Sequence, residues 1–458
     1  MNRLLEGTEE TAGTPRNGRG AVTHRMTAAM PPRVRELGSS DVGRAAGMAA
    51  AVMVQNIVAL GFTVAFAHIL GADGYGSLGA LLAAFLILMI PGTALQVTVA
   101  REVSSAMAIG QQPPGPAIRS WMRALTIGAG VVLVLSLLLR DVAADIIHVD
   151  ATWAAGAVLP TGALWLTLCV QRGVLQGLHR YGLVAVSLIG ESVTRLVFSL
   201  IFVAASMHVT GAFLGTTASI LAMSLFLGFV LHQELERAPS GHTPPAHERL
   251  RALVGRAWAP LLALAFFGVL QNVDVIVVKH RIGHDPAGSW AAAVVAGKVI
   301  IWIAVGLGMY LLPETARRTQ LGESARPVLL RTFAIVAAAA VPMTLIFLAG
   351  GHLLLEKVFG AKLTAADSAL PILGLAFTFL AFTYVATQYL LALNRSRFIV
   401  FLGIAAVIDP ILLSVMEARL TAIAAALCVL QLCLAVVVGF IAVRARIAPP
   451  SDRDIAQS

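Results

Sequence analysis

The chain has 458 residues, of which 58% are hydrophobic and only 12% are charged. Soluble domains are typically about a quarter charged, so a soluble fold could not cover so apolar an interior. The net charge of +9 does not indicate nucleic-acid binding, because the basic residues lie in short segments between long apolar runs and form no single patch. With a mean hydropathy of +0.83, the chain is identified as a polytopic membrane protein.

The first 43 residues differ from the rest of the chain. They are polar and basic, and they lack the apolar segment of a signal peptide. We therefore expect residues 1–43 to form a disordered cytoplasmic tail.

Twelve later segments are long and apolar enough to cross a bilayer, which takes about 20 residues. They predict an all-α membrane protein with twelve transmembrane helices. In the first half the segments are Arg44–Leu70, Ser77–Ala100, Trp121–Leu139, Trp153–Gly177, Gly182–Met207 and Gly211–His232. In the second half they are Ala257–Val278, Pro286–Leu312, Leu329–Ala349, Ser368–Leu393, Phe398–Met416 and Leu420–Val443.

The basic residues orient these spans. If the N-terminus is cytoplasmic, the cytoplasmic segments hold 25 Lys and Arg residues and the outer loops hold 6, leaving Arg195 and Lys298 within spans. This bias predicts that both termini are cytoplasmic, in a bacterial inner membrane. Lys279 and Arg281 are the main local exception.

The longest polar break inside the chain runs from residue 233 to 256 and contains "APSGHTPPAHER". It reads as a cytoplasmic linker. The chain then divides into an N-lobe (44–232, spans one to six), the linker (233–256), a C-lobe (257–443, spans seven to twelve) and a cytoplasmic tail (444–458).

The two halves echo each other. "HILGADGYGSLGA" (His68–Ala80) recurs as "HRIGHDPAGSWAA" (His280–Ala292), "LQGLHR" as "LLALNR", and "AR" after span two as "AR" after span eight, at offsets of 212, 215 and 216 residues. Three echoes in the same span order indicate homologous halves. Six spans per half make the repeat parallel, and two such lobes enclose a midplane cavity suited to alternating access.

The first echo falls where the chain turns between two spans at the outer side. We expect Gly71, Gly76, Gly283 and Gly288 to supply this tight turn. We also expect the aspartate at position 73 or 285 to cap the following helix.

Four stretches together resemble a known superfamily. "HILGADGYGSLGALLAAF", "VTVARE", "LQGLHRYGLVAVSLIGE" and "LQNVDVIVVKHRIGHDPAGSWAAA…LLPETAR" are similar to polysaccharide and lipid-linked oligosaccharide flippases of the MOP (multidrug/oligosaccharidyl-lipid/polysaccharide) exporter superfamily, over about residues 44–443. The superfamily has no ATPase site, and the chain contains no GxxxxGKS/T motif.

Five ionisable residues fall inside spans, where they are costly and usually face a cavity or a partner: Glu191, Arg195, Asp274, Lys298 and Asp409. Glu191 and Arg195 lie four residues apart on one helix face, so they can pair. Either the pair neutralises itself, or Arg195 binds a phosphate or pyrophosphate with Glu191 poising it.

Asp274 and Asp409 lie on spans seven and eleven, and Pro410 frees a backbone carbonyl about one turn before it. In lipid-II flippases of this superfamily, acidic residues on these two spans form a sodium site. The resemblance therefore implies a site for a coupling ion, Na⁺ or H⁺, at Asp274 and Asp409. Alternatively, Asp274 bonds a neighbouring helix or pairs with Lys298. We expect no cofactor and no other metal site.

The remaining candidates are polar groups. Lys298 either pairs with Asp274 or is a cavity cation that meets a substrate phosphate. The pairs Gln55–Asn56 and Gln271–Asn272 sit on the equivalent spans one and seven. They either line the cavity or form hydrogen bonds between helices.

The leading hypothesis is a flippase, not an enzyme. It moves an undecaprenyl-pyrophosphate-linked oligosaccharide or a similar polysaccharide precursor to the outer leaflet, beside the glycosyltransferases or polymerase of its pathway. A multidrug or metabolite extruder of the same superfamily is the alternative. A membrane polymerase, ligase or glycosyltransferase is disfavoured, because the longest outer loop, about Gly350–Asp367, is short and poor in paired carboxylates.

Overall fold

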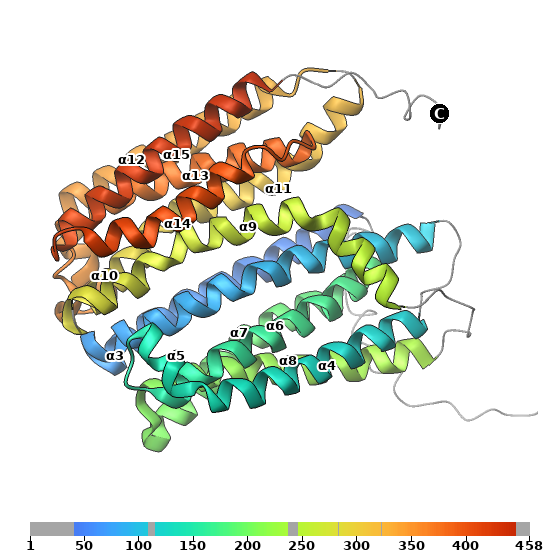
Figure 1. The fold of residues 1–458 in the computed structure, drawn as a ribbon, viewed down its shortest axis with the longest axis horizontal. Coiled ribbons are helices and arrows are strands. Elements are labelled where there is room, and N and C mark those ends of the chain that lie inside the picture. The colour runs from blue at the N-terminus through green and yellow to red at the C-terminus, as the bar shows by residue number, and fades with distance from the viewer. Residues whose placement is uncertain (1–40, 109–114, 237–245, 283, 322, 446–458) are drawn as a thin grey trace, which may run out of the picture.

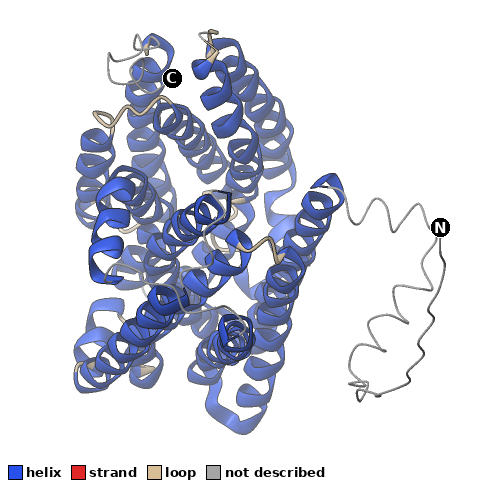
Figure 2. Ribbon diagram, turned by 90° about the vertical axis from the view of Figure 1, so that its right-hand side faces the viewer, coloured by secondary structure: helices blue, strands red, loops and turns tan. Residues whose placement is uncertain are grey.

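The structure is a computed structural model that describes residues 41–108, 115–236, 246–282, 284–321 and 323–445. Within these ranges the chain forms helices joined by short turns, and no strand occurs (Figure 2). The predicted all-α class is confirmed. Most of the expected N-terminal tail, the middle of the linker, Gly283 and nearly all of the C-terminal tail lie outside the described residues.

Thirteen α-helices make up the described part. Those of the first half are α3 (Asp41–Ala108), α4 (Gly115–Leu138), α5 (Arg140–Ile147), α6 (Thr152–Gly177), α7 (Tyr181–Phe202) and α8 (His208–Glu236). Those of the second half are α9 (Ala246–Ile282), α10 (His284–Gly297), α11 (Val299–Gln320), α12 (Arg326–Phe359), α13 (Leu370–Ala392), α14 (Ile399–Val415) and α15 (Leu420–Arg444). A π-helical turn, Val203–Met207, joins α7 to α8, and a 3₁₀ turn, Ala361–Leu363, follows α12.

Nine helical stretches of the described chain are long and apolar enough to cross a membrane, and Ile399–Val415 is a shorter apolar helix. Two of the nine, Ala50–Ser104 and Tyr181–Glu234, have 55 and 54 residues, more than twice the length of one crossing. The first is broken at Gly71 and the second at Ala205 and Ser206, where the backbone is non-helical. Counting each of these two as two spans gives eleven, and Ile399–Val415 accommodates the twelfth predicted crossing.

The helices form two groups that lie side by side (Figure 1). The buried apolar residues of α3 to α8 form one core, and those of α9 to α15 form a second core that a few side chains of α3 join. Contacts of α3 with α9 and α10 connect the groups. We refer to the two groups as the N-lobe and the C-lobe.

Large apolar side chains cover the outside of both lobes. Leu138, Leu348 and Val415 are each at least 70% exposed. A soluble protein does not carry an exposed apolar surface of this extent. In a bilayer, lipid chains cover these side chains, and the helices satisfy their own backbone hydrogen bonds.

Both ends of the expected linker, residues 233–256, are helical in the structure. α8 continues to Glu236, and α9 already begins at Ala246. Residues 246–256 therefore belong to a helix, although the polar composition of this stretch favoured a linker. Its Pro and Gly residues lie before Ala246, apart from Gly255, which the helix accommodates.

The echoed motif forms a turn at Gly71 and also a close contact between the two lobes. Gly71 has a positive φ of 68°, so the predicted turn is confirmed there, since glycine adopts this conformation without strain. For Gly76 and Gly288 the prediction is wrong, because both lie inside helices. A Cβ atom on Gly76 would lie 2.8 Å from the backbone nitrogen of Gly288, and one on Gly288 would overlap the carbonyl oxygen of Ala72. These two glycines allow the lobes to touch.

Polar contacts surround this glycine contact. The Nζ atom of Lys279 in the C-lobe donates to Oδ1 of Asp73 in the N-lobe at 3.0 Å. The Nδ1 atoms of His148 and His280 lie 2.8 Å apart, also across the lobes. Lys279 was an exception to the charge bias of the loops. Its ion pair with Asp73, in which the lysine side chain is buried and the aspartate is exposed, gives a structural reason for that exception.

A carboxylate at the far end of α11 is held by two arginines. Glu314 accepts hydrogen bonds from Arg317 at 3.0 Å and from Arg318 at 2.7 Å. These bonds lower the pKa of Glu314 from its ordinary value to about 2. Glu314 therefore stays ionised at neutral pH, and the ion pairs are lost only when the pH falls toward 2.

Candidate substrate cavity between the lobes

A cavity of about 380 Å³ lies between the lobes, next to the glycine contact. Its walls come from α3, α6 and α7 on one side and from α9, α10 and α11 on the other, with Lys298 joining the last two helices. This volume is within the range of small-molecule binding sites. Because both lobes contribute to the wall, any change in their relative position changes the cavity.

All seven residues predicted to line a cavity lie on this wall. The N-lobe contributes Gln55, Asn56, Glu191 and Arg195, and the C-lobe contributes Gln271, Asn272 and Lys298. Gln55–Asn56 and Gln271–Asn272 thus occupy the same cavity from opposite sides, which matches their equivalent places in the repeat. Their role in binding stays a prediction.

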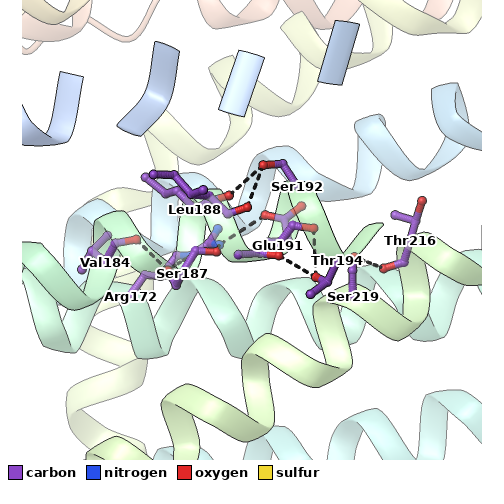
Figure 3. Close-up of polar contacts among 11 residues, drawn as sticks. Arg172, Val184, Ser187, Leu188, Glu191, Ser192, Thr194, Thr216 and Ser219 are labelled. Atoms are coloured by element: carbon purple, nitrogen blue, oxygen red, sulfur yellow. Dashed lines mark hydrogen bonds and ion pairs between the residues drawn. The ribbon is translucent and has the colours of Figure 1, made fainter. Parts of the chain in front are cut away.

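Glu191 does not pair with Arg195, so the alternative in which these two side chains neutralise each other is wrong. Its Oε2 atom instead accepts a hydrogen bond of 3.2 Å from Nη2 of Arg172, and both side chains are almost fully buried. Figure 3 shows Arg172 approaching Glu191 with Ser187 beside them. Arg172 of α6 is thus the ion-pair partner of Glu191. Arg195, which lies on the same helix as Glu191, forms no ion pair with it.

Arg195 is therefore a cation without a carboxylate partner among the described residues. Its Nε atom is buried and has no hydrogen-bond partner there. Its guanidinium carbon lies 5.3 Å from the ring centroid of Phe62, another residue of the cavity wall. A cation over an aromatic face gains about 0.5–2 kcal/mol, which compensates only part of the desolvation of a charge.

Lys298 is the second cation of the cavity. Its Nζ atom donates to Oδ1 of Asn272 at 2.9 Å, and Asn272 donates to the carbonyl oxygen of Gly268 at 2.8 Å. The predicted alternative, direct pairing with Asp274, is replaced by this bond to a neutral amide. Lys298 and Asp274 are still near enough to interact electrostatically. The cavity thus holds two positive charges and one carboxylate that Arg172 already matches.

Asp274 and Asp409 lie behind the cavity wall, inside the C-lobe, and are 1% and 0% exposed. Oδ2 of Asp274 accepts a hydrogen bond of 3.0 Å from Nε1 of Trp290, which matches the alternative in which Asp274 bonds a neighbouring helix. In the described structure Oδ1 of Asp274 and both carboxylate oxygens of Asp409 have no hydrogen-bond partner. The two carboxyl groups interact electrostatically.

The chemistry of this cluster fits a small cation or a proton. Oε1 of Gln431 is a further buried acceptor without a partner among the described residues, and the Gln431 side chain bonds the backbone of Leu270 on α9. Oxygen acceptors that lack donors suit hard cations. The described chain has no group of three or more His, Cys, Asp or Glu residues that could hold a metal ion, so any cation here would rely on the two carboxylates and neutral oxygens.

Arg172 is the site residue that the sequence analysis missed. The charge count assigned it to a cytoplasmic segment, whereas the structure buries it inside α6 at 1% exposure. The available signal was its position, five residues before the end of the predicted span Trp153–Gly177. An arginine more than one helical turn inside a span is a candidate partner for a buried acid.

The structure thus places a polar cavity at the interface of two helical lobes, and comparison with known protein families identifies the family of the chain. The chain belongs to the polysaccharide biosynthesis protein family, whose model matches residues 45–317. The predicted resemblance to polysaccharide biosynthesis proteins is thereby confirmed. No curated protein sequence matches the chain.

Solved structures with low sequence identity share the fold. An inward-facing multidrug resistance MATE family transporter of the MOP superfamily has 16% identity and a TM-score of 0.68, covering 86% of this chain and 94% of its own. An outward-facing structure of a multidrug resistance MATE family transporter has 15% identity and a TM-score of 0.60, covering 90% of this chain and 97% of its own. A MOP superfamily transporter from Pyrococcus furiosus, for which reversed pocket polarity suggests a different function, has 16% identity and a TM-score of 0.59, covering 90% and 97%.

Proposed function

We propose that the protein is a flippase that moves a lipid-linked oligosaccharide, or a similar polysaccharide precursor, across the bacterial cytoplasmic membrane by alternating access. The observation that carries the proposal is the positive charge of the cavity. Arg195 has no carboxylate partner among the described residues. The hydrogen bond of Lys298 in the described chain goes to a neutral amide, while the Asp274 carboxyl interacts with it only electrostatically from behind the cavity wall. Such a cavity suits an anionic headgroup.

The residues that line the cavity can bind both polar parts of such a substrate, the phosphate groups and the sugars. Arginine and lysine form strong charge-assisted hydrogen bonds with phosphate oxygens. The amides of Gln55, Asn56 and Gln271 can bond sugar hydroxyls. The lipid tail would stay in the bilayer while the headgroup passes between the lobes. With both termini cytoplasmic, the substrate would come from glycosyltransferases at the inner face and leave toward a polymerase outside.

A multidrug extruder is the second candidate, because the similar solved structures include multidrug resistance MATE transporters. An organic cation would meet Arg195 and Lys298 in the cavity, and like charges repel in a partly buried site. Pocket polarity is also the property said to suggest a different function for the Pyrococcus furiosus transporter. The polarity of this cavity favours the flippase.

Leaflet translocation tests the proposal. The protein is reconstituted in liposomes with a fluorescent oligosaccharide on a polyprenyl pyrophosphate, and exposure of the sugar to an external lectin is followed over time. Protein-dependent exposure is expected, and efflux of an organic cation dye from the same vesicles is not. Dye efflux without translocation of any lipid-linked saccharide would overturn the flippase and favour the extruder.

We also propose that Asp274 and Asp409 bind the coupling ion, Na⁺ or H⁺. Moving one charge across the membrane is worth about 2.3 kcal/mol per 100 mV, enough to bias the exchange between conformations. Support comes from their burial and from the three carboxylate oxygens without partners in the described chain.

Asp409→Asn is expected to remove the dependence of translocation on an imposed ion gradient, because the amide keeps the shape and loses the charge. The measurement compares translocation with a Na⁺ gradient, a pH gradient and no gradient. Asp145→Asn, at an exposed position on α5, is the matched control and should retain the wild-type dependence. A gradient response in Asp409→Asn equal to that of the wild type would exclude Asp409 from the ion site.

A further inference from the structure

We propose that Arg172 is a positioning residue for substrate binding, because its pairing with Glu191 leaves Arg195 available to an anionic headgroup. The inference rests on the proposed function and adds a residue that does not line the cavity. The pairing explains why the N-lobe wall of the cavity keeps the positive charge of Arg195 although it also contains the carboxylate of Glu191.

Arg172 is fixed from several directions (Figure 3). Its Nε atom donates to Oγ of Ser187 at 2.9 Å, and its Nη2 atom donates to the carbonyl oxygen of Ser187 at 2.9 Å and to Oε2 of Glu191 at 3.2 Å. Its guanidinium carbon also lies 5.4 Å from the ring centroid of Trp165. The arginine thus clamps α7 against α6 and holds the Glu191 carboxylate on the side of α6.

Glu191 has a second cation within reach on its own helix. Arg195 lies four residues further along α7, the spacing at which an acid and a base on a helix pair. Both residues line the cavity. If Arg172 were absent, a buried and unmatched Glu191 would be strongly unfavourable, and Arg195 is the nearest partner along the helix. The positive charge on the N-lobe wall would then be neutralised.

The two possible pairings predict opposite electrostatic properties of the same cavity. With Glu191 on Arg172, as in the structure, Arg195 can give its donors to a phosphate. With Glu191 on Arg195, the headgroup would have to displace a carboxylate that carries the same sign of charge. Arg172 therefore acts on the substrate through Glu191 and touches no part of the substrate itself.

The test measures binding of geranylgeranyl pyrophosphate to the purified full-length protein by calorimetry, with geranylgeraniol as the uncharged control. Four proteins are compared: wild type, Arg172→Met, Glu191→Gln and the double variant. Arg180→Met is the matched control, since Arg180 also pairs with a glutamate, Glu234, at 3.1 Å, but in an exposed position. Thermal unfolding of each variant verifies that it is folded.

Arg172→Met is expected to bind the pyrophosphate about tenfold more weakly, a change of about 1.4 kcal/mol. Glu191→Gln should bind the pyrophosphate more tightly than Arg172→Met does, because it leaves no carboxylate to pair with Arg195. The double variant should regain wild-type affinity, because no carboxylate remains to capture Arg195. This rescue separates positioning from a general loss of structure, and Arg180→Met should not change the affinity.

If the wild type binds the pyrophosphate, two outcomes would overturn this inference but leave the proposed function intact. One is unchanged affinity in Arg172→Met, and the other is a folded double variant that fails to regain affinity. A wild type that binds the pyrophosphate no better than the alcohol would overturn the proposed function, and this inference with it. The two failures are therefore distinguishable.

Discussion

Arg195→Ala is expected to lower the initial rate of leaflet translocation by about ten- to hundredfold. A hydrogen bond to a charged group is worth about 1.5–3 kcal/mol, and each 1.4 kcal/mol changes a binding or rate constant about tenfold. Arg195 is the cavity cation with no hydrogen-bond partner for its buried Nε atom in the described chain, so its donors are the ones that a headgroup can use. The lectin assay in proteoliposomes measures the rate.

Two controls make this result specific. Arg195→Lys keeps the charge but loses the planar set of donors, so it should retain part of the activity. Arg180→Ala removes an exposed arginine that pairs with Glu234 and should translocate at the wild-type rate. If Arg195→Ala translocated as fast as Arg180→Ala, the cationic cavity would have no part in transport.

Gly288→Ala is expected to reduce translocation by about five- to hundredfold, by preventing the lobes from closing at the Gly71 end. The added Cβ atom would overlap the carbonyl oxygen of Ala72, and a backbone atom cannot move aside as a flexible side chain can. Overpacking of this kind costs about 1–3 kcal/mol. A transporter that must close this contact in each cycle would spend less time in the closed state.

Cross-linking measures that closure directly. Asp73→Cys and Lys279→Cys replace the ion pair across the lobes, in a protein whose native Cys169, Cys428 and Cys433 are changed to alanine. The yield of the cross-link should fall when Gly288→Ala is added. Gly306→Ala is the matched control, because a Cβ atom there meets no atom of the described chain within 4 Å. Equal yields in the two glycine variants would contradict the proposed role of the contact.

Much of the fold could be predicted from the sequence, because the bilayer imposes simple rules. Long apolar runs must be helices in lipid, and the spacing of the echoed motifs indicated two halves. The turn at Gly71 was predictable for a local reason, since a positive φ favours glycine. Gly76 and Gly288 were assigned to the same turn because their role involves a partner 212 residues away, which the local pattern does not reveal.

The residues that line the candidate cavity could be predicted from the sequence, but their pairings and the buried Arg172 could not. Polar and ionisable residues inside spans are rare, so the seven cavity residues could be selected by position alone. The partner of Glu191 depended on how α6 is rotated against α7, and apolar periodicity is weak in helices that are apolar on every face. The i, i+4 rule therefore suggested Arg195, whereas tertiary packing supplied Arg172.

The most direct measurement is a structure of the protein bound to a polyprenyl-pyrophosphate-linked oligosaccharide, determined by electron cryomicroscopy in lipid nanodiscs. The account predicts density for the pyrophosphate between Arg195 of the N-lobe and Lys298 of the C-lobe, with Glu191 still bonded to Arg172. Density for the headgroup elsewhere on the protein, with the cavity between the lobes free of it, would contradict the account.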